Sequence, residues 1–481
     1  MCKLLFQTRL TEKIGIYQAE NQVRDIQLDR DTNHARVGSI FLGKVRNIDR
    51  SIEAAFIEIE KDIVGFLPKS EYPFKDKFGS ALTDGASVIV QVIKEAYQDK
   101  GPRLTANITF PGASMVYLPY SAFLACSKKL SEQQREKMEG LLKPLLEDQE
   151  GLIIRTQSVD LADEVIISQL EQLRKQFATL VHNAKSKKAP FPLLTTSQVP
   201  DQMINQYQSK KLTEIIFDQM EVMRQMQQKY PDLAEVMSYS QMPVPDNQKT
   251  VDQLLEEAVH PTVRTKEGIA ITIEQTEGLT VIDVDSSQFQ SRQNKRITLY
   301  QINQKAVRPI AAEIQKRNLS GIILIDFLKM KKKEEHQHIL QLLRKELLKD
   351  PIRTEVYGFT KLGLVEMTRK REHVGLLQLM TERATTASAE RTMESYAYQF
   401  ERELDRWNHT KTEAIIVACS QEFDKLLQEK VYPNVREQVT LDVYKMIDHS
   451  ISNYQIVRSG SWELIHEYME QHSALVIDKV L

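Results

Sequence analysis

The sequence predicts a multidomain protein of the α+β class, and three observations lead to that prediction. Its 481 residues are too many for one ordinary hydrophobic core, so we expect two to four folded units. With 41% hydrophobic and 27% charged residues, the composition is typical of globular proteins and argues against disorder on a large scale. Stretches that alternate apolar and polar residues, as strands do, are interspersed with stretches that have the apolar spacing of amphipathic helices.

The first 110 residues favour β-structure. Residues 1–35 contain two alternating stretches around a turn, and this piece looks too small to fold alone. From residue 36 onward, short β-type segments are separated by turn residues, at 38–45, 54–59, 65–67 and 87–93. We therefore predict a small β-barrel over residues 36–110.

The next segments are more helical. Residues 111–204 predict a compact α+β unit with amphipathic helices at about 131–146 and 162–182, and residues 184–192 look like a connector. Residues 205–260 are mostly helical in pattern. We expect them to supply the second half of the small N-terminal piece.

An α/β layered domain is predicted from about residue 263 to residue 371. Its order of elements is strand, strand, helix, strand, helix and a strand pair, at 268–276, 279–284, 297–317, 321–327, 336–349 and within 355–368. The polar, small residues of 383–391 favour a linker within 372–391. The last segment, 392–481, is predicted to be a small α+β module.

Bulk properties narrow the function classes. A formal net charge of −2 means that any nucleic-acid site must be locally basic. The three cysteines, Cys2, Cys126 and Cys419, lie far apart without a CxxC pair, which argues against a disulfide framework or a zinc knuckle and favours a reducing cytoplasm. We see no apolar run of the ~20 residues that span a bilayer and no export signal, so we expect a cytoplasmic protein.

Three carboxylates carry the sharpest chemical signal. Asp283 and Asp285 end one apolar β-type segment, and side chains two residues apart on a strand share a face. Asp326 ends a second such segment, so all three acids converge at one sheet edge if the two strands are neighbours. Mg²⁺ prefers oxygen ligands and keeps several waters, so two or three acids and a substrate phosphate suffice to bind it. The alternative is that these acids are solvated strand ends or helix caps.

Three sequence blocks around these acids resemble the ribonuclease E/G family. They are IEQTEGLTVIDV at 273–284, RNLSGIILIDF at 317–327 and KLGLVEMTRKR at 361–371. The resemblance implies a DNase I-like catalytic domain over 263–371 in which Asp283 and Asp326 hold magnesium. The usual asparagine of the family two residues after the first acid is Asp285 here; it can still ligate or orient water but adds negative charge near the phosphate.

Basic residues of the same domain are candidates for RNA contact. Arg353 matches an RNA-contacting arginine of the family, although a lone arginine is equally often ordinary surface. Lys329 stands where the family often has an acid, and it adds to the basic group Lys331, Lys332 and Lys333. That group is interpreted either as a solvated helix start or as an RNA contact.

The predicted barrel resembles an S1-type OB-fold, which implies RNA binding. Phe56 and Phe66 would be its stacking platform, because aromatic faces on such barrels hold unstacked bases at roughly 1 to 3 kcal/mol per base. Lys100 matches a lysine that supports RNA in the family. The alternative for both phenylalanines is a place in the barrel core.

Residues 111–204 resemble the family's sensor of an RNA 5′ end. Arg155 and Thr156 match the arginine and threonine that hold a 5′-monophosphate, and an arginine supplies paired donors suited to phosphate oxygens. Gly112 and Val116 match the backbone positions of that pocket. Taken alone, Arg155 and Thr156 at a strand end would be ordinary surface.

The resemblance also implies the overall organisation. Residues 1–35 and 205–262 would form an RNase H-like domain into which the S1 barrel (36–110) and the 5′-sensor (111–204) are inserted, followed by the DNase I-like domain, the linker 372–391 and the small domain 392–481. Family members commonly carry a CPxC zinc link after the third block; residues 372–391 contain no cysteine, so no zinc link is expected, and a homodimer would form without it.

The function implied is that of a magnesium-dependent endoribonuclease, with Mn²⁺ as a substitute metal, acting on single-stranded RNA in RNA processing and mRNA decay. Its products would carry 5′-phosphate and 3′-hydroxyl ends. Two alternatives stay open: a non-catalytic RNA-binding protein derived from the same family, and metal-independent cleavage by a histidine pair, for which the ten histidines are too scattered to argue well.

Overall fold

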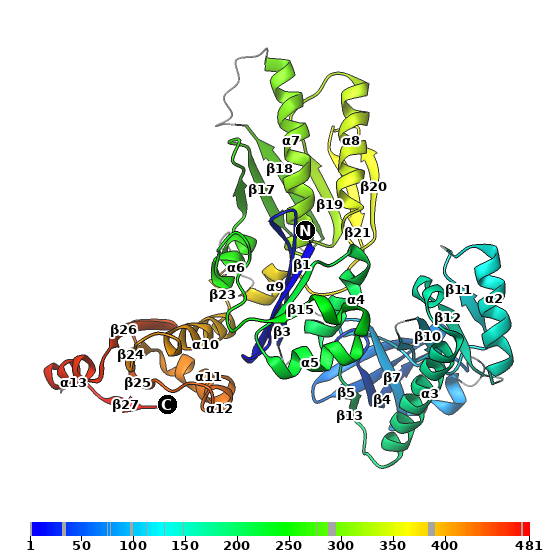
Figure 1. Ribbon diagram of the computed structural model, residues 1–481, viewed down its shortest axis with the longest axis horizontal. Coiled ribbons are helices and arrows are strands. Elements are labelled where there is room, and N and C mark those ends of the chain that lie inside the picture. Colours follow the sequence, from blue (N-terminus) through cyan, green and yellow to red (C-terminus); the bar gives the residue numbers. More distant parts are fainter. Residues whose placement is uncertain are drawn as a thin grey trace. The chain divides into compact units, whose positions relative to one another are not determined.

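The computed structural model divides the chain into two compact units, and each is described by itself. One unit is Thr32–Thr196; the other combines Met1–Asp31 with Ser197–Leu481 (Figure 1). The structure describes residues 2–30, 35–74, 76, 78–96, 100–112, 114–128, 130–147, 149–276, 278–286, 295–382, 390–472 and 475–481. The predicted linker 372–391 therefore lies partly outside the described residues, and the finer division into domains stays a prediction.

A closed barrel occupies the first half of the Thr32–Thr196 unit. Its five strands pair in the order β4-β5-β6-β8-β7, and pairing of β4 with β7 closes the ring, which is consistent with an S1-type OB-fold. The β4 strand is long and shared, since β13 (Phe191–Leu194) also pairs with it. The barrel strands are β4 (Ile40–Asp49), β5 (Ala54–Glu60), β6 (Ile63–Pro68), β7 (Ser87–Lys94) and β8 (Arg103–Thr105), with the short helix α1 (Phe78–Ala81) between β6 and β7.

A four-stranded sheet with two helices forms the rest of this unit. The strand order is β11-β12-β10-β9, and the helices α2 and α3 pack on it around a core that includes Leu152, Met138 and Leu170. Ser131 and Gln134 form a capping box that starts α2, and Pro144 follows the end of α2 in a 3₁₀ turn, which makes the helix shorter than predicted. The elements are β9 (Phe110–Pro111), β10 (Met115–Leu118), β11 (Leu124–Cys126), α2 (Glu132–Leu142), β12 (Gly151–Ile154), a 3₁₀ helix (Thr156–Asp160) and α3 (Asp163–Lys185).

The second unit begins with a five-stranded sheet to which both of its chain segments contribute strands. Its order is β15-β14-β1-β2-β3, so residues near 215 lie parallel to the first strand of the protein. The sequence pattern missed β14 because a four-residue apolar run does not distinguish a strand from a helix. The strands are β1 (Cys2–Gln7), β2 (Glu12–Ala19), β3 (Gln22–Arg30), β14 (Glu214–Phe217) and β15 (Met237–Tyr239), and the accompanying helices are α4 (Met203–Tyr207), α5 (Met220–Lys229), α6 (Val251–Val259) and α9 (Leu376–Met380).

A six-stranded mixed sheet with two helices on one face follows. The helices α7 and α8 cover the face that carries Ile282, Ile323 and Ile325, all of them buried (Figure 1). The order β16-β17-β18-β19-β21-β20 places β18 beside β19 in parallel. The elements are β16 (Thr262–Arg264), β17 (Ala270–Gln275), β18 (Leu279–Asp285), α7 (Lys295–Lys316), β19 (Gly321–Asp326), α8 (Lys333–Leu347), β20 (Thr354–Phe359) and β21 (Val365–Arg369).

The C-terminal segment forms an α+β module. A four-stranded sheet, β26-β24-β25-β27, has a fully buried central strand β24. Its elements are α10 (Met393–Asn408), β24 (Ala414–Cys419), α11 (Gln421–Lys430), α12 (Tyr432–Val435), β25 (Asp442–Ile447), β26 (Tyr454–Gly460), α13 (Trp462–Gln471) and β27 (Ile477–Lys479). The mixed α+β, multidomain class predicted from the sequence is confirmed. None of the helices in the described ranges is long and apolar enough to cross a membrane.

One buried carboxyl of α10 makes stability depend on pH. Glu401 is only 1% exposed, and the Thr11 amide and hydroxyl donate to its Oε1 at 3.0 and 2.7 Å. Burial raises the pKa of Glu401 to about 7 despite these hydrogen bonds. A carboxyl whose pKa is raised on folding destabilises the native state when it ionises, so the free energy of unfolding falls as pH rises from about 4.5 to 7.

We therefore expect Glu401→Gln to remove this pH dependence. The variant should be more stable than the wild type at pH 8 by up to about 3 kcal/mol, and close to it at pH 4.5, because an amide has no charge to bury. Denaturant unfolding at several pH values measures the difference. A stability gain that stays the same at every pH would contradict the assignment to Glu401 ionisation.

Candidate active site

The two strands that carry the predicted acids are neighbours. β18 and β19 run parallel, and Asp283 and Asp326 are direct partners in their register. Neighbouring strands lie about 4.8 Å apart, so the two carboxylates start from adjacent positions at the same end of the strands. Ile282 and Val284, on either side of Asp283, are buried on the helix-covered face, which leaves Asp283 exposed on the opposite face.

The negative charges of Asp283 and Asp326 are not neutralised by a described basic side chain. Partial desolvation raises the pKa of Asp283, and the charges of Asp326 and Asp285 raise it further. Among the residues that the structure describes, no ion pair neutralises Asp283 or Asp326. Two hard oxygen donors without a protein cation beside them match what Mg²⁺ binds, since this ion usually takes one or two carboxylates and keeps several waters.

The third predicted acid, Asp285, lies near Asp283 but is not part of the pair that Asp283 forms with Asp326. Asp285 is exposed on the same face two residues beyond Asp283, and its partner in β17 is Ala270. Within the described parts of the chain, no group of three or more His, Cys, Asp or Glu side chains is arranged to hold a metal ion. The arrangement is thus a two-carboxylate pair with Asp285 beside it.

Arg353 is not brought to the acids. It precedes β20, whose first residue Thr354 pairs with Arg369, and Arg369 also pairs with Gly321 at the beginning of β19. Asp326 is at the other end of β19, about 17 Å away at 3.3 Å per residue. The Arg353 side chain is 79% exposed and forms an ion pair with Glu355. Contact of Arg353 with RNA stays a prediction, and any such contact would be made far from Asp283 and Asp326.

The barrel presents its two predicted aromatic residues together. Phe56 and Phe66 are partners across β5 and β6, with ring centroids 5.9 Å apart in an edge-to-face arrangement. Their neighbours Ala55, Ile57 and Leu67 fill the barrel core, so the two half-buried rings lie on the outer surface. The alternative of a core position for Phe56 and Phe66 is therefore wrong.

The backbone segment that follows Lys100 runs alongside β6, the strand that carries Phe66. The Phe66 amide donates to the Pro102 carbonyl oxygen at 2.8 Å, and a Cβ on Gly101 would come within 2.0 Å of the Val64 carbonyl oxygen. Glycine at 101 thus allows the segment of Lys100 to approach β6 closely. The Lys100 side chain is exposed.

The residues predicted to bind a 5′-monophosphate lie where β10 and β12 pair. Met115 is opposite Ile154, and the Arg155 amide donates to the Ser114 carbonyl oxygen at 2.8 Å. Gly112 closes the adjoining turn by donating to the Met115 carbonyl oxygen at 2.7 Å. A Cβ on Gly112 would lie 3.2 Å from Leu173 on α3, so a side chain there would press on that helix. Two further predicted residues adjoin these: Val116 on β10 and the exposed Thr156 after Arg155.

Gln169 supports this site and was missed by the sequence analysis. It lies on α3, and its Oε1 accepts from the Ser114 amide at 2.9 Å and from the Ser114 hydroxyl. Ser114 itself is completely buried. In sequence, Gln169 is one of several polar residues of an amphipathic helix, and nothing in its spacing distinguishes it.

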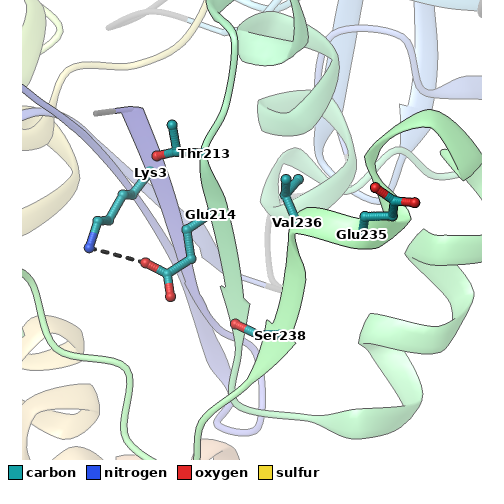
Figure 2. Close-up of a pocket in the computed structure, with 6 residues that line it drawn as sticks. All are labelled: Lys3, Thr213, Glu214, Glu235, Val236 and Ser238. Carbon is teal, nitrogen blue, oxygen red and sulfur yellow. Dashed lines mark ion pairs between the residues drawn. The ribbon is translucent and has the colours of Figure 1, made fainter.

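A separate hollow of about 430 Å³ lies at the five-stranded sheet (Figure 2). Lys3 at its wall pairs with Glu214 and with Asp246, each at 3.0 Å. These ion pairs satisfy the only cation that lines the hollow within the described residues, and no predicted site residue lines it. The hollow therefore contributes nothing to the carboxylate pair.

Comparisons with known proteins match the chain over the same region. The model of the ribonuclease E/G family matches residues 109–372, more than half of the chain, including both acids and the sensor residues. Ribonuclease G of Haemophilus influenzae is 28% identical over 423 residues, which cover 83% of this chain and 86% of the relative. Ribonuclease G of Escherichia coli K12 is 26% identical over 412 residues, covering 80% of this chain and 84% of the relative.

Ribonuclease E of Synechocystis is also similar, with 31% identity over 369 residues. The match covers 72% of this chain but only 54% of the relative. The chain therefore spans about half the length of this longer relative, while it spans most of the ribonuclease G proteins.

Proposed function

The chain belongs to the ribonuclease E/G family and is an endoribonuclease, and we propose that it hydrolyses single-stranded RNA with Mg²⁺ and favours substrates with a 5′-monophosphate. The observation that carries the proposal is the pairing of Asp283 with Asp326 in register on adjacent strands. The six-stranded layered domain would then be the DNase I-like catalytic domain, and the five-stranded sheet the RNase H-like domain.

The catalytic roles follow from the chemistry of the acids. Asp283 and Asp326 would hold the cation, whose binding removes the repulsion that raises the pKa of Asp283. When bound, Mg²⁺ supplies charge neutralisation for the phosphate and acidifies a water for attack. Asp285, exposed two residues away, would orient the attacking water by accepting a hydrogen bond from it. The water oxygen would bond to phosphorus and lose a proton to solvent as the bond from phosphorus to the 3′-oxygen breaks. The leaving 3′-oxygen would take a proton from solvent, so the products carry 5′-phosphate and 3′-hydroxyl ends.

RNA binding would come from the barrel and the sensor. The outward rings of Phe56 and Phe66 offer faces for bases irrespective of sequence, and the exposed Lys100 adds a positive charge beside them. At the sensor, the Arg155 guanidinium, the Thr156 hydroxyl and the backbone around Gly112 and Val116 would bind the terminal phosphate. We propose that the protein acts in RNA processing and mRNA decay in the cytoplasm, and that any homodimer forms without a zinc link.

Cleavage of matched oligonucleotides tests the proposal. A/U-rich RNAs with a 5′-monophosphate or a 5′-triphosphate are incubated with Mg²⁺ or with chelator, and the product ends are identified. We expect Mg²⁺-dependent cutting, faster on the monophosphate. Binding without cutting would support a non-catalytic RNA-binding protein, and cutting that resists chelator with cyclic phosphate ends would support a histidine mechanism.

Variants of the sensor test the 5′-end preference separately. Arg155→Ala should lower the preference for the monophosphate on the order of 10-fold, because charge-assisted hydrogen bonds to phosphate are lost. Gln169→Ala should have the same direction of effect, because Ser114 loses the partner that positions its turn against Arg155. The measured quantity is the ratio of cleavage rates on the two substrates.

The matched control is Gln172→Ala, an exposed glutamine one turn further along α3. It should leave the ratio unchanged. Equal loss of cleavage on both substrates in Arg155→Ala would count against the sensor assignment.

A further inference from the structure

Four lysines gather in five residues immediately after the strand that ends in Asp326. Lys329, Lys331, Lys332 and Lys333 are all exposed, and none of them has an ion pair with another described residue. The whole chain has a formal net charge of −2, so this is a strong local excess of positive charge. We call residues 328–333 the basic loop.

The backbone of the basic loop is held by the core. Asn303 on α7 is completely buried; its Nδ2 donates to the Leu328 carbonyl oxygen at 2.7 Å, and its Oδ1 accepts from the Leu328 amide at 3.0 Å. Leu328 and Met330 pack against the hydrophobic core of the domain. Because these two side chains point inward, the backbone of the loop is fixed. Lys329, which lies between them, and Lys331, which follows Met330, are exposed to solvent.

The basic loop leaves the sheet at the same edge as the acids. β19 ends at Asp326, the partner of Asp283, and the loop begins two residues later. Lys329 is thus three residues from Asp326 along a backbone that Asn303 fixes. A loop that begins two residues beyond Asp326, at the same end of the sheet, can place its lysines against phosphates that flank the one bound at Asp283 and Asp326.

The fold does not need these charges. Lys332 caps α8 and Lys333 is its first residue, where the partial positive charge of a helix N-terminus disfavours a cation. Glu334 and Glu335 follow in the first turn, and Glu335 accepts weakly from the Lys332 amide at 3.4 Å. The acids suit the helix; the four lysines before them are unfavourable for it, so a structural role does not explain them.

We propose that Lys329 and Lys331 bind the phosphodiester backbone of RNA next to the bond that is cut. The proposal rests on the proposed ribonuclease function and adds two RNA-binding residues to it. Contacts between lysine and phosphate are independent of sequence and release counterions, so they make binding depend on salt. The loop would supply the locally basic surface that a nearly neutral protein needs for RNA.

The test compares the double variant Lys329→Gln/Lys331→Gln with two controls. Lys345→Gln removes one positive charge at the other end of α8, about 18 Å along the helix from Lys333, and Lys329→Arg/Lys331→Arg keeps both charges of the loop. Binding of a labelled A/U-rich oligonucleotide is measured in chelator by fluorescence anisotropy, from about 50 to 200 mM salt. Cleavage with Mg²⁺ is measured separately, and Tm checks folding.

We expect the double glutamine variant to reduce the salt slope of log affinity by about 1.4, which is about 0.7 for each of two phosphate contacts on a single strand, and to weaken binding on the order of 10-fold at the lower salt concentrations. KM should rise with kcat nearly unchanged, and Tm should be unchanged or slightly higher. Both controls should behave like the wild type. A salt slope unchanged in the double variant, or a slope that falls in Lys345→Gln by as much per charge removed, would overturn the proposal.

The two hypotheses fail in different measurements. If the wild type binds the oligonucleotide but does not cut it with Mg²⁺, the proposed function fails while the loop is still judged by its salt slope. If cutting is normal and the double variant shows the wild-type slope and KM, the loop proposal alone is wrong. Absence of RNA binding by the wild type in chelator would also overturn it, because the lysine contacts need no metal.

Discussion

Asp283→Asn and Asp326→Asn should each lower the rate of RNA cleavage on the order of 10³-fold, because loss of a metal ligand removes several kcal/mol of transition-state stabilisation. Both variants should still fold and bind RNA. Removing one of two unneutralised neighbouring charges relieves the repulsion that raises the pKa of Asp283, so Tm without metal should be unchanged or higher. Single-turnover cleavage and thermal unfolding measure the two effects.

A carboxylate on the next strand is the matched control. Glu274 on β17 is exposed and opposite Val281, two register positions before Asp283. Glu274→Gln should keep cleavage near the wild-type rate, while Asp285→Asn should cause a smaller loss than the two ligand variants because an amide oxygen still accepts a hydrogen bond. Full cleavage by Asp326→Asn would rule out the proposed roles of the pair.

Arg402→Met should destabilise the protein by about 2 to 3 kcal/mol, because the buried Glu12 and the partly buried Asp252 each lose one of their two arginine partners. Arg402 on α10 is 7% exposed; its Nη1 donates to Glu12 at 2.5 Å and its Nε to Asp252 at 2.8 Å. Glu12 is 2% exposed, and Arg30 donates to its other oxygen at 2.8 Å. This network attaches α10 of the C-terminal module to the five-stranded sheet. The loss of stability in Arg402→Met should therefore appear in the first unfolding transition.

An exposed ion pair serves as the comparison. Lys249 and Glu257 are paired with 41% and 45% of their side chains exposed, and Lys249→Gln should change the free energy of unfolding by less than about 1 kcal/mol. If Arg402→Met were no more destabilising than Lys249→Gln, the buried network would not be what holds α10.

Local sequence patterns predicted the elements of the six-stranded layered domain and the neighbouring positions of Asp283 and Asp326. Each acid ends a short apolar run, and parallel neighbouring strands bring such ends together. The pairing of Asp283 with Asp326 could therefore be predicted on the single assumption that the two strands are neighbours. The outward position of Phe56 and Phe66 follows likewise from alternation along strands that face the barrel core.

Contacts that join distant parts of the chain could not be predicted in this way. Arg402 and Glu12 are 390 residues apart, and charged residues in both segments look solvated in sequence. Gln169 supports Ser114 across 55 residues from a helix with many polar positions. Arg353 is exposed and far from Asp326 because of the register between β20 and β21, and the residues of these two strands do not reveal that register.

Titration of the metal-free protein with Mn²⁺, followed by electron paramagnetic resonance, tests the central claim most directly. The account predicts one site in the wild type and in Glu274→Gln, and loss of that site in both Asp283→Asn and Asp326→Asn. A site of undiminished affinity in either aspartate variant would contradict it.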